Sequence, residues 1–320
     1  TELIALRKGL AMATSENDKP GILTILRQKA QAAESGETGK EIKIEHDEEA
    51  IGGRYRLGKS LGVGGMGRVQ EAWDNRLERS VAVKFLKEKD DAAHRAAFFW
   101  EATLLSKLEH PGTLPCYDVG EDEDWGPYFV MKKIEGSTLW DMMLDRDKVE
   151  DEQTRYAQTL DLVRIVEKVC ETVAFAHSKG FIHRDLKPEN VMVDEFGVVH
   201  VMDWGLAKPL YNDDRPDVAK TSQGSLRGTP MYMAPEQVRA DSETIGATTD
   251  VFAIGTLLYE VLTCQAPFEA KDIGQIFKRI ETESPPAPHH IEPRIAKQLS
   301  AICLKAIEKD QDGRYQSVKA

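Results

Sequence analysis

The chain has 320 residues, of which 41% are hydrophobic and 30% are charged, a balance that predicts a folded protein and argues against intrinsic disorder. This length is typical of two lobes or domains rather than one small core. The net charge of −12 disfavours binding to nucleic acids and to anionic membrane surfaces by bulk electrostatics.

Cysteine usage and hydropathy indicate the compartment. The four cysteines are far apart and show neither a zinc-binding spacing nor a paired framework, so we expect free thiols in a reducing, cytoplasmic compartment. The longest apolar run, residues 251–262, contains Glu260 and is too short for a membrane span. No signal peptide is evident, and residue 1 is Thr rather than Met, as in a fragment or a processed chain.

Residues 1–34 have the periodicity of two short helices, each with one apolar stripe. The stripes consist of Leu3, Leu6 and Leu10 in the first helix, and of Ile22, Ile25 and Leu26 in the second. Residues 35–53 are polar, acidic and glycine-bearing, which is typical of a linker. Two interpretations stay open: a mobile tail, or a segment that docks on the rest of the protein or on a second copy, giving a homodimer.

A glycine motif follows, with Gly62, Gly64 and Gly67 in G-x-G-x-x-G spacing. Alone this motif is a weak signal, because a dinucleotide-binding turn has the same spacing. In a dinucleotide-binding turn a helix follows the glycines directly, whereas residues 69–73 and 81–84 here have the pattern of strands. A strand–loop–strand unit favours a lid whose backbone amides approach the phosphates of a nucleotide.

Two opposite charges are expected to meet beside this loop. Lys84 ends the strand V-A-V-K, and Glu101 lies on a helix predicted over residues 98–108 with apolar residues three and four positions away. A carboxylate on an apolar helix face is costly unless it is paired, and we predict Lys84 as its partner. A solvated surface charge is the alternative for each residue taken alone.

The densest group of polar residues lies at 181–190, F-I-H-R-D-L-K-P-E-N, after a helix predicted over residues 161–178. A role in phosphoryl transfer would explain why these polar residues are close together in the sequence. The Asp185 carboxylate can accept the proton of an attacking hydroxyl, and the Lys187 ammonium can offset charge on the transferred group. Two further residues, one on either side of a hairpin predicted over residues 191–201, are the predicted metal ligands; they are Asn190 and Asp203.

In this order and spacing, the motifs resemble the protein kinase catalytic domain, specifically the Ser/Thr kinases of bacterial type, over roughly residues 55–319. The resemblance implies an α+β, two-lobed protein kinase fold over residues 54–320, after a helical extension and linker over residues 1–53. The expected lobes are a small β-rich N-lobe, 54–133, and a larger helical C-lobe, 134–320. Relatives continue into another helix beyond the position of Ala320, so the C-terminal edge is expected to be truncated.

The same resemblance implies transfer of the γ-phosphoryl of ATP to Ser or Thr hydroxyls of proteins, with Mg²⁺, or alternatively Mn²⁺, as the metal. Asp185 is the expected base, and Lys187 supports the γ-phosphoryl. Lys84, held by Glu101, is expected to bind the α- and β-phosphates. The residues expected to contact ATP are Gly62, Val63, Gly64, Gly65, Met66, Gly67, Val69, Ala82, Lys84, Met131 and Ile134.

The sequence departs from the family pattern at two places. Met131 matches the gatekeeper position, but Lys132 and Lys133 replace an acidic and an aromatic residue common in the hinge of relatives, so the ribose contacts are not predicted. Trp204 stands where Phe is usual. We expect it to fill the same slot between the lobes, stacking with Leu105, Cys116 and His183.

Residues 208–227 match the activation loop of kinases. The candidates for autophosphorylation are Thr221, Ser222 and Ser225. Thr229, in a G-T-P context together with Lys187, indicates the Ser/Thr class and is expected to serve the substrate platform.

Two acidic residues of the C-lobe are expected to be buried and therefore paired. Glu236, in A-P-E, is matched with Arg314, in D-G-R-Y. Asp250 opens the apolar run and is expected to cap the backbone of residues 183–184.

Two other classes of protein share this fold. A pseudokinase, which is a binding scaffold without catalysis, usually lacks the catalytic Asp, the Lys or a metal ligand, and this chain keeps all of them. A small-molecule kinase lacks the G-T-P…A-P-E segment for peptide binding, which residues 228–236 carry. A metal-dependent ATP turnover assay on a peptide mixture separates a kinase from a pseudokinase.

Overall fold

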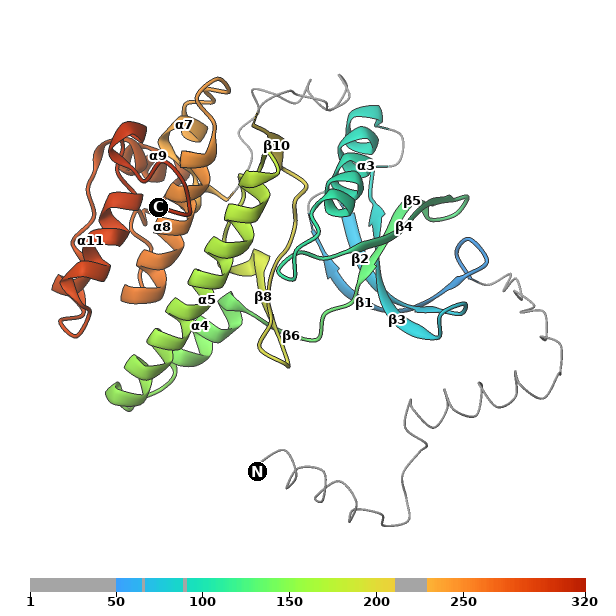
Figure 1. Ribbon diagram of the computed structural model, residues 1–320, viewed down its shortest axis with the longest axis horizontal. Coiled ribbons are helices and arrows are strands. Elements are labelled where there is room, and N and C mark those ends of the chain that lie inside the picture. Colours follow the sequence, from blue (N-terminus) through green and yellow to red (C-terminus); the bar gives the residue numbers. More distant parts are fainter. Residues whose placement is uncertain (1–49, 65–66, 89–90, 211–228) are drawn as a thin grey trace, which may run out of the picture. The chain divides into compact units, whose positions relative to one another are not determined.

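The computed structural model describes residues 50–64, 67–88, 91–210 and 229–320, all within the unit formed by residues 47–320. Several predicted features lie outside the described residues. They are the two helices of residues 1–34, most of the linker, Gly65, Met66, Thr221, Ser222 and Ser225. The described residues form a β-rich N-lobe and a largely helical C-lobe (Figure 1), which confirms the expected two-lobed kinase fold.

The N-lobe is an antiparallel five-stranded sheet in the order β1-β2-β3-β5-β4, against which helix α3 packs (Figure 1). Its elements are β1 (Tyr55–Val63), β2 (Gly67–Asp74), β3 (Arg79–Leu86), α3 (Ala92–Lys107), β4 (Cys116–Asp122) and β5 (Gly126–Lys132). Strand β1 pairs with β2 up to the glycine motif, where Val63 is the register partner of Arg68. The predicted strand–loop–strand unit is therefore confirmed, and the dinucleotide-binding turn is excluded.

The side chains of β3 alternate between two cores. Val83 and Phe85 pack with Tyr128 on one face of the sheet, whereas Leu86 belongs to the core that includes α3. Because side chains two positions apart share a face, Lys84 points to the same side as Leu86, toward the helix and the C-lobe.

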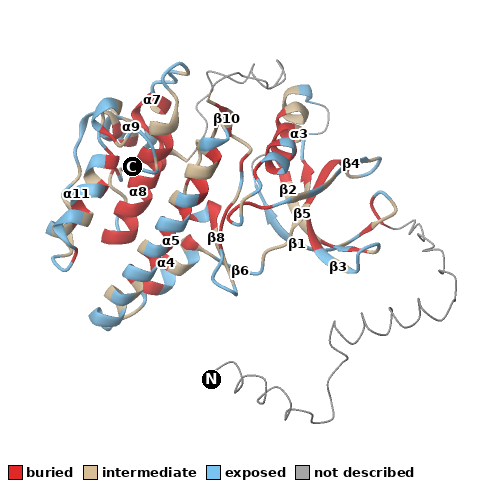
Figure 2. Ribbon diagram, in the orientation of Figure 1, coloured by how far each residue is buried: buried red, intermediate tan, exposed pale blue. Residues whose placement is uncertain are grey.

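The C-lobe is built around two long helices, α5 (Glu152–Ser178) and α8 (Ala247–Thr263). Helix α8 is buried along nearly its whole length (Figure 2), which explains why its sequence is a continuous apolar run without a polar face. The other helices are α4 (Leu139–Asp147), α7 (Pro235–Val238), α9 (Ile273–Thr282), α10 (Pro288–Ile291) and α11 (Lys297–Ala306). Within the described ranges, no helix is both long and apolar enough to cross a membrane.

Short strands and 3₁₀ turns connect the helices of the C-lobe. The strands are β6 (Gly136–Thr138), β7 (Phe181–Ile182), β8 (Val191–Asp194), β9 (Val199–Val201) and β10 (Lys208–Pro209). They form a three-stranded sheet, β6-β8-β9, and a two-stranded one, β10-β7. Short 3₁₀ turns cover Pro188–Asn190, Pro230–Tyr232 and Gln311–Gly313. The predicted hairpin over residues 191–201 is confirmed as β8 and β9.

Helix α5 begins at Glu152, well before the predicted start at Asp161. Asp151 caps it, because its carboxylate accepts a hydrogen bond of 2.7 Å from the Thr154 amide. The first two turns are mostly exposed and polar, so they have no apolar stripe that could reveal them in the sequence.

Glu236 and Arg314 form the predicted buried ion pair between α7 and the C-terminal end. Arg314 Nη1 and Nη2 each lie 2.9 Å from one carboxylate oxygen of Glu236, and Thr249 Oγ1 donates a third hydrogen bond of 2.8 Å to that carboxylate. Both charged side chains are almost fully buried. A bidentate, hydrogen-bonded pair of this kind compensates the cost of taking two charges out of water.

Replacing Arg314 with Leu should therefore leave the Glu236 carboxylate buried without its counter-ion. We expect the free energy of unfolding to fall by about 3–5 kcal/mol. The matched control is Arg239→Leu, which removes the exposed ion pair of Arg239 with Glu281 and should cost less than about 1 kcal/mol. Urea unfolding of both variants measures the difference, and equal losses would contradict the structural role of the buried pair.

Candidate active site

A cavity of about 630 Å³ lies between the lobes, and most of the predicted site residues line it. Those residues are Gly62, Gly64, Gly67, Val69, Ala82, Lys84, Glu101, Met131, Ile134, Asp185, Lys187, Asn190, Asp203 and Thr229. Val63 does not line the cavity, and 68% of its surface is exposed. Gly67, the last glycine of the motif, is also the first residue of β2, and its backbone pairs with β3. A Cβ atom at this position would come within 2.3 Å of the Phe85 carbonyl oxygen, which explains the need for glycine.

Lys84 and Glu101 form an ion pair in this cavity, as predicted. Lys84 Nζ lies 2.7 Å and 2.8 Å from the two carboxylate oxygens of Glu101, which reaches across from α3. Burial raises the pKa of the Glu101 carboxyl, and the Lys84 ammonium opposes this effect. Burial alone would lower the pKa of Lys84, but the two carboxylates beside it, Glu101 and Asp203, raise it above its ordinary value. The ammonium is therefore held charged in the cavity.

Asp203 of the C-lobe also contacts the Lys84 ammonium. Its Oδ1 lies 3.5 Å from Lys84 Nζ, and its side chain is half exposed toward the cavity. Burial alone would raise the pKa of the Asp203 carboxyl, but the positive charge of Lys84 holds this pKa below its ordinary value. Asp203 has a left-handed φ of 57°, which is uncommon for a residue other than glycine and is frequent at functional sites.

Asp250 of α8 holds the loop of residues 183–190, between β7 and β8, in place. We call this segment the catalytic loop. The Asp250 carboxylate is fully buried and accepts hydrogen bonds of 2.8 Å from the backbone amides of His183 and Arg184. His177 Nε2, at the end of α5, lies 2.7 Å from the same carboxylate. The predicted cap on residues 183–184 is confirmed. These contacts hold Arg184 in a left-handed conformation, φ 73°, which sets the direction of the chain just before Asp185.

Asp185 is the centre of a hydrogen-bond network between the catalytic loop and the G-T-P segment. The Thr229 amide donates to Asp185 Oδ1 at 2.9 Å, and Lys187 Nζ lies 3.3 Å from Oδ2. Lys187 Nζ also donates to Thr229 Oγ1 at 2.8 Å. Asn190 Nδ2 donates to the backbone carbonyl of Asp185 at 2.8 Å. The four residues that sequence spacing singled out are thus brought together around one carboxylate.

Trp204 lies in the core that includes residues of both lobes, as predicted, but its ring is tilted by 59° to that of His183 and is not stacked on it. It is fully buried, and its ring centroid lies 4.5 Å from that of His183. Leu105 and Cys116 belong to the same core. The indole nitrogen donates a hydrogen bond of 3.0 Å to the Val201 carbonyl oxygen, so the polar atom that Trp has and Phe lacks is satisfied.

Five apolar residues of the cavity wall were not revealed by the sequence. They are Leu61, Leu114, Met192, Met202 and Leu206. Each lies in or beside a strand among other apolar residues, so nothing in the sequence distinguishes a side chain that lines a cavity from one that fills a core. Thr138, at the start of α4, also lines the cavity, and its side chain is the N-cap of that helix.

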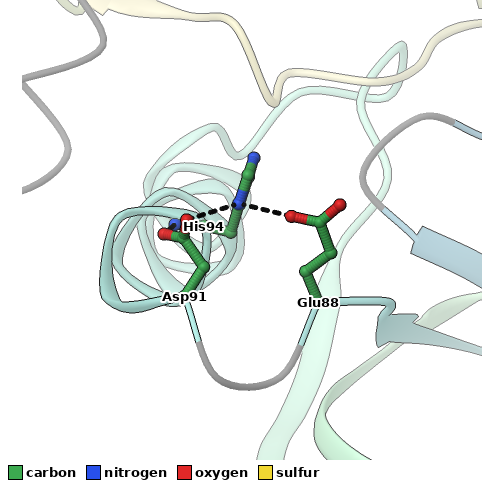
Figure 3. A group of neighbouring side chains, drawn as sticks. All are labelled: Glu88, Asp91 and His94. Atoms are coloured by element: carbon green, nitrogen blue, oxygen red, sulfur yellow. Dashed lines mark hydrogen bonds and ion pairs between the residues drawn. The ribbon is translucent and has the colours of Figure 1, made fainter.

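A separate group of Glu88, Asp91 and His94 offers three ligand atoms within 4.8 Å of one another at the start of α3 (Figure 3). Asp91 caps the helix, accepting hydrogen bonds of 2.7 Å and 2.9 Å from the amides of Ala93 and His94. His94 Nδ1 lies 3.1 Å from Glu88 and 3.3 Å from Asp91. All three side chains are about a third exposed or more. Helix capping and close surface contacts account for this arrangement, which lies outside the cavity.

The two-lobed fold and the paired lysine in the cleft define the architecture of a protein kinase. The family model of the protein kinase domain matches residues 55–319, and the chain belongs to this family. Probable serine/threonine-protein kinase SCO3848 of Streptomyces coelicolor is 38% identical over 272 residues, which cover 83% of this chain and 38% of that protein. Serine/threonine-protein kinase PknB of Mycobacterium leprae is 36% identical over 271 residues, 82% of this chain and 41% of that protein.

A third relative, serine/threonine-protein kinase PknD of Protochlamydia amoebophila, is 34% identical over 290 residues, which cover 83% of this chain and 29% of that protein. The chain thus spans about two fifths or less of the length of these curated relatives. The resemblance found in the motifs, to bacterial Ser/Thr kinases, is confirmed.

The ion pair generates a prediction that separates function from folding. Lys84→Met removes the cation from the cavity and should lower ATP turnover by roughly 10²–10³. Glu101→Gln keeps the size of the side chain but removes the charge that orients Lys84, so it should lower turnover less. Circular dichroism and thermal unfolding test whether both variants still fold. A fully active Glu101→Gln protein would show that another residue holds Lys84.

Proposed function

We propose that residues 55–319 act as a protein Ser/Thr kinase that transfers the γ-phosphoryl of ATP to protein hydroxyls. The observation that carries this proposal is the convergence of Lys84, Asp185, Asn190 and Asp203 on one cavity between the lobes. These residues come from three segments of the chain: β3, the loop that holds Asp185 and Asn190, and the segment after β9. Phosphoryl transfer requires a positioned base, a phosphate-binding cation and metal ligands in one place.

Asp185 is the base in this proposal. Its Oδ1 accepts from the Thr229 amide and its Oδ2 faces Lys187, so the carboxylate is held in one orientation at the cavity wall. From there it orients the substrate hydroxyl and takes its proton as the bond to phosphorus forms. Lys187 lies next to it and offsets the negative charge on the transferred phosphoryl.

Asn190 and Asp203 are the residues that fit a divalent metal ion. Carboxylate and amide oxygens are the ligands that Mg²⁺ prefers, and Mn²⁺ accepts the same donors. The Asn190 amide nitrogen is engaged with Asp185, which leaves the amide oxygen as its ligand atom. When bound, the ion neutralises charge on the phosphate oxygens of ATP.

ATP itself is proposed to lie with its adenine against the apolar part of the wall and its phosphates toward Lys84. Ala82 and Met131 are opposite each other in the β3–β5 register and both line the cavity. The backbone of residues 132–134, where β5 ends, supplies the polar groups for the edge of the adenine. The glycine motif covers the phosphates from β1 and β2.

The proposed acceptor is Ser or Thr rather than Tyr. Support comes from the hydrogen bond of 2.8 Å between Lys187 and Thr229, which links the base to the G-T-P segment, and from relatives named as serine/threonine-protein kinases. The proposal has three further parts. They are autophosphorylation at Thr221, Ser222 or Ser225, a cytoplasmic location, and a homodimer formed through residues 1–34. Phosphorylation between β10 and Thr229 adds negative charge close to Thr229 in the sequence.

Asp185→Asn tests the assignment of the base. The substitution keeps the size and most hydrogen bonds of the side chain but removes the proton acceptor, so turnover should fall about 10²–10⁴-fold while ATP binding persists. The matched control is Asp145→Asn, which changes an exposed aspartate paired with Lys148 on α4. Turnover on a peptide mixture and ATP affinity by calorimetry are measured for both. If Asp185→Asn keeps near-normal turnover, another group is the base.

A further inference from the structure

Lys133, one of the two lysines that depart from the hinge pattern of relatives, lies in the segment of residues 133–135 that joins β5 to β6. Its ammonium makes two short contacts, 2.5 Å to Glu71 Oε1 and 2.6 Å to Glu135 Oε1. Only 12% of the Lys133 side chain is exposed, and its two chain neighbours, Lys132 and Ile134, line the cavity. The two carboxylates raise the pKa of Lys133, so it is charged throughout the physiological range.

Glu71 belongs to the face of the N-lobe sheet that covers the cavity. It is two residues from Val69 on β2 and is the register partner of Ala82 on β3, and both of these residues line the cavity. Because side chains alternate along a strand, Glu71 points to the same face as Val69. Ser80 Oγ donates to the same Glu71 oxygen at 3.0 Å, and Lys133, with Ser80, lowers the pKa of Glu71. This carboxylate is thus ionised and fixed at the rim of the cavity.

Glu135 is tied to the C-lobe. Its backbone carbonyl accepts a hydrogen bond of 3.2 Å from the amide of Glu195, in the turn between β8 and β9. Lys133 therefore connects a strand of the N-lobe to a residue anchored on the C-lobe, within the segment that joins the two lobes. Both carboxylate oxygens are within hydrogen-bond distance of one ammonium, so without that ammonium two like charges would face each other at close range.

We propose that the bridge Glu71–Lys133–Glu135 is a positioning device for the nucleotide: it draws β2 toward the hinge and so keeps Val69 and Ala82 close over the adenine. Lys133 does not line the cavity and acts through these neighbours, so it is a positioning residue rather than a catalytic one. This inference rests on the proposed function, since it specifies how the same cavity holds ATP. It also explains how this chain tolerates lysine in place of the aromatic residue of its relatives.

The bridge should affect nucleotide affinity and leave the chemical step unchanged. We expect Lys133→Met to weaken MgATP binding about five- to tenfold and to raise KM for ATP by the same factor, with kcat at saturating ATP close to that of the parent protein. Glu71→Gln, which keeps Lys133 paired with Glu135, should act in the same direction but less. The matched control is Lys168→Met, which breaks a single exposed ion pair with Glu171 on α5, remote from the cavity, and should change neither constant.

Two further measurements distinguish a bridge from a general packing effect. Glu71→Lys combined with Lys133→Glu restores an ion pair between positions 71 and 133 but places two carboxylates at positions 133 and 135, so it should restore only part of the affinity that Lys133→Met loses. High salt should reduce the difference between parent and Lys133→Met, because ions screen partly exposed charges.

Calorimetry with MgATP separates this inference from the proposed function, because it requires no turnover. A parent protein that binds no MgATP would overturn the function and the bridge together. A parent protein that binds MgATP while Lys133→Met and Lys168→Met bind it equally well would overturn the bridge alone. Loss of kcat in Lys133→Met without a change in KM would also contradict it, since it would place Lys133 in the chemical step.

Discussion

The Lys84 ammonium forms ion pairs with a carboxylate of each lobe, Glu101 and Asp203, and the arrangement of the cleft depends on these contacts. A charge taken out of water must be paired, and here the partners come from α3 and from the segment after β9. The strand, the helix and the C-lobe residue Asp203 can satisfy this charge together only when the lobes are correctly placed. A packing requirement of the fold and a phosphate-binding requirement of the site are thus met by the same residue.

The C-lobe contains two further buried carboxylates that must be paired or hydrogen-bonded, Asp250 and Glu236. Asp250 is buried and accepts hydrogen bonds from the loop between β7 and β8, so α8, the most buried of the described helices, determines where Asp185 lies. Glu236 and Arg314 hold α7, and with it the G-T-P…A-P-E segment, to the end of the chain. The polar residues of the active site are therefore supported by a hydrophobic frame through a small number of buried, fully paired charges, which is why removal of one partner is expected to cost so much.

The sequence predicted the parts of the site that charge and spacing specify. Lys84 with Glu101, Glu236 with Arg314 and the cap by Asp250 could be predicted because an unpaired buried charge is costly, so each needs a partner. The apolar wall, with Leu114 and Met192, could not be distinguished from ordinary core, and the early turns of α5 carry no apolar stripe. The bridge of Lys133 to Glu71 joins residues far apart in the sequence, through a strand register that only the structure supplies.

The central claim is that this cleft transfers phosphoryl groups from ATP to Ser and Thr, and mass spectrometry tests it most directly. The chain is incubated with ATP, Mg²⁺ and a mixture of Ser-, Thr- and Tyr-containing peptides, with the Asp185→Asn protein as a parallel sample. The account predicts phosphoryl groups on Ser and Thr of the peptides, and on the chain at Thr221, Ser222 or Ser225, in the parent sample alone. Phosphorylation confined to Tyr, equal phosphorylation in both samples, or none on peptides or chain would contradict it.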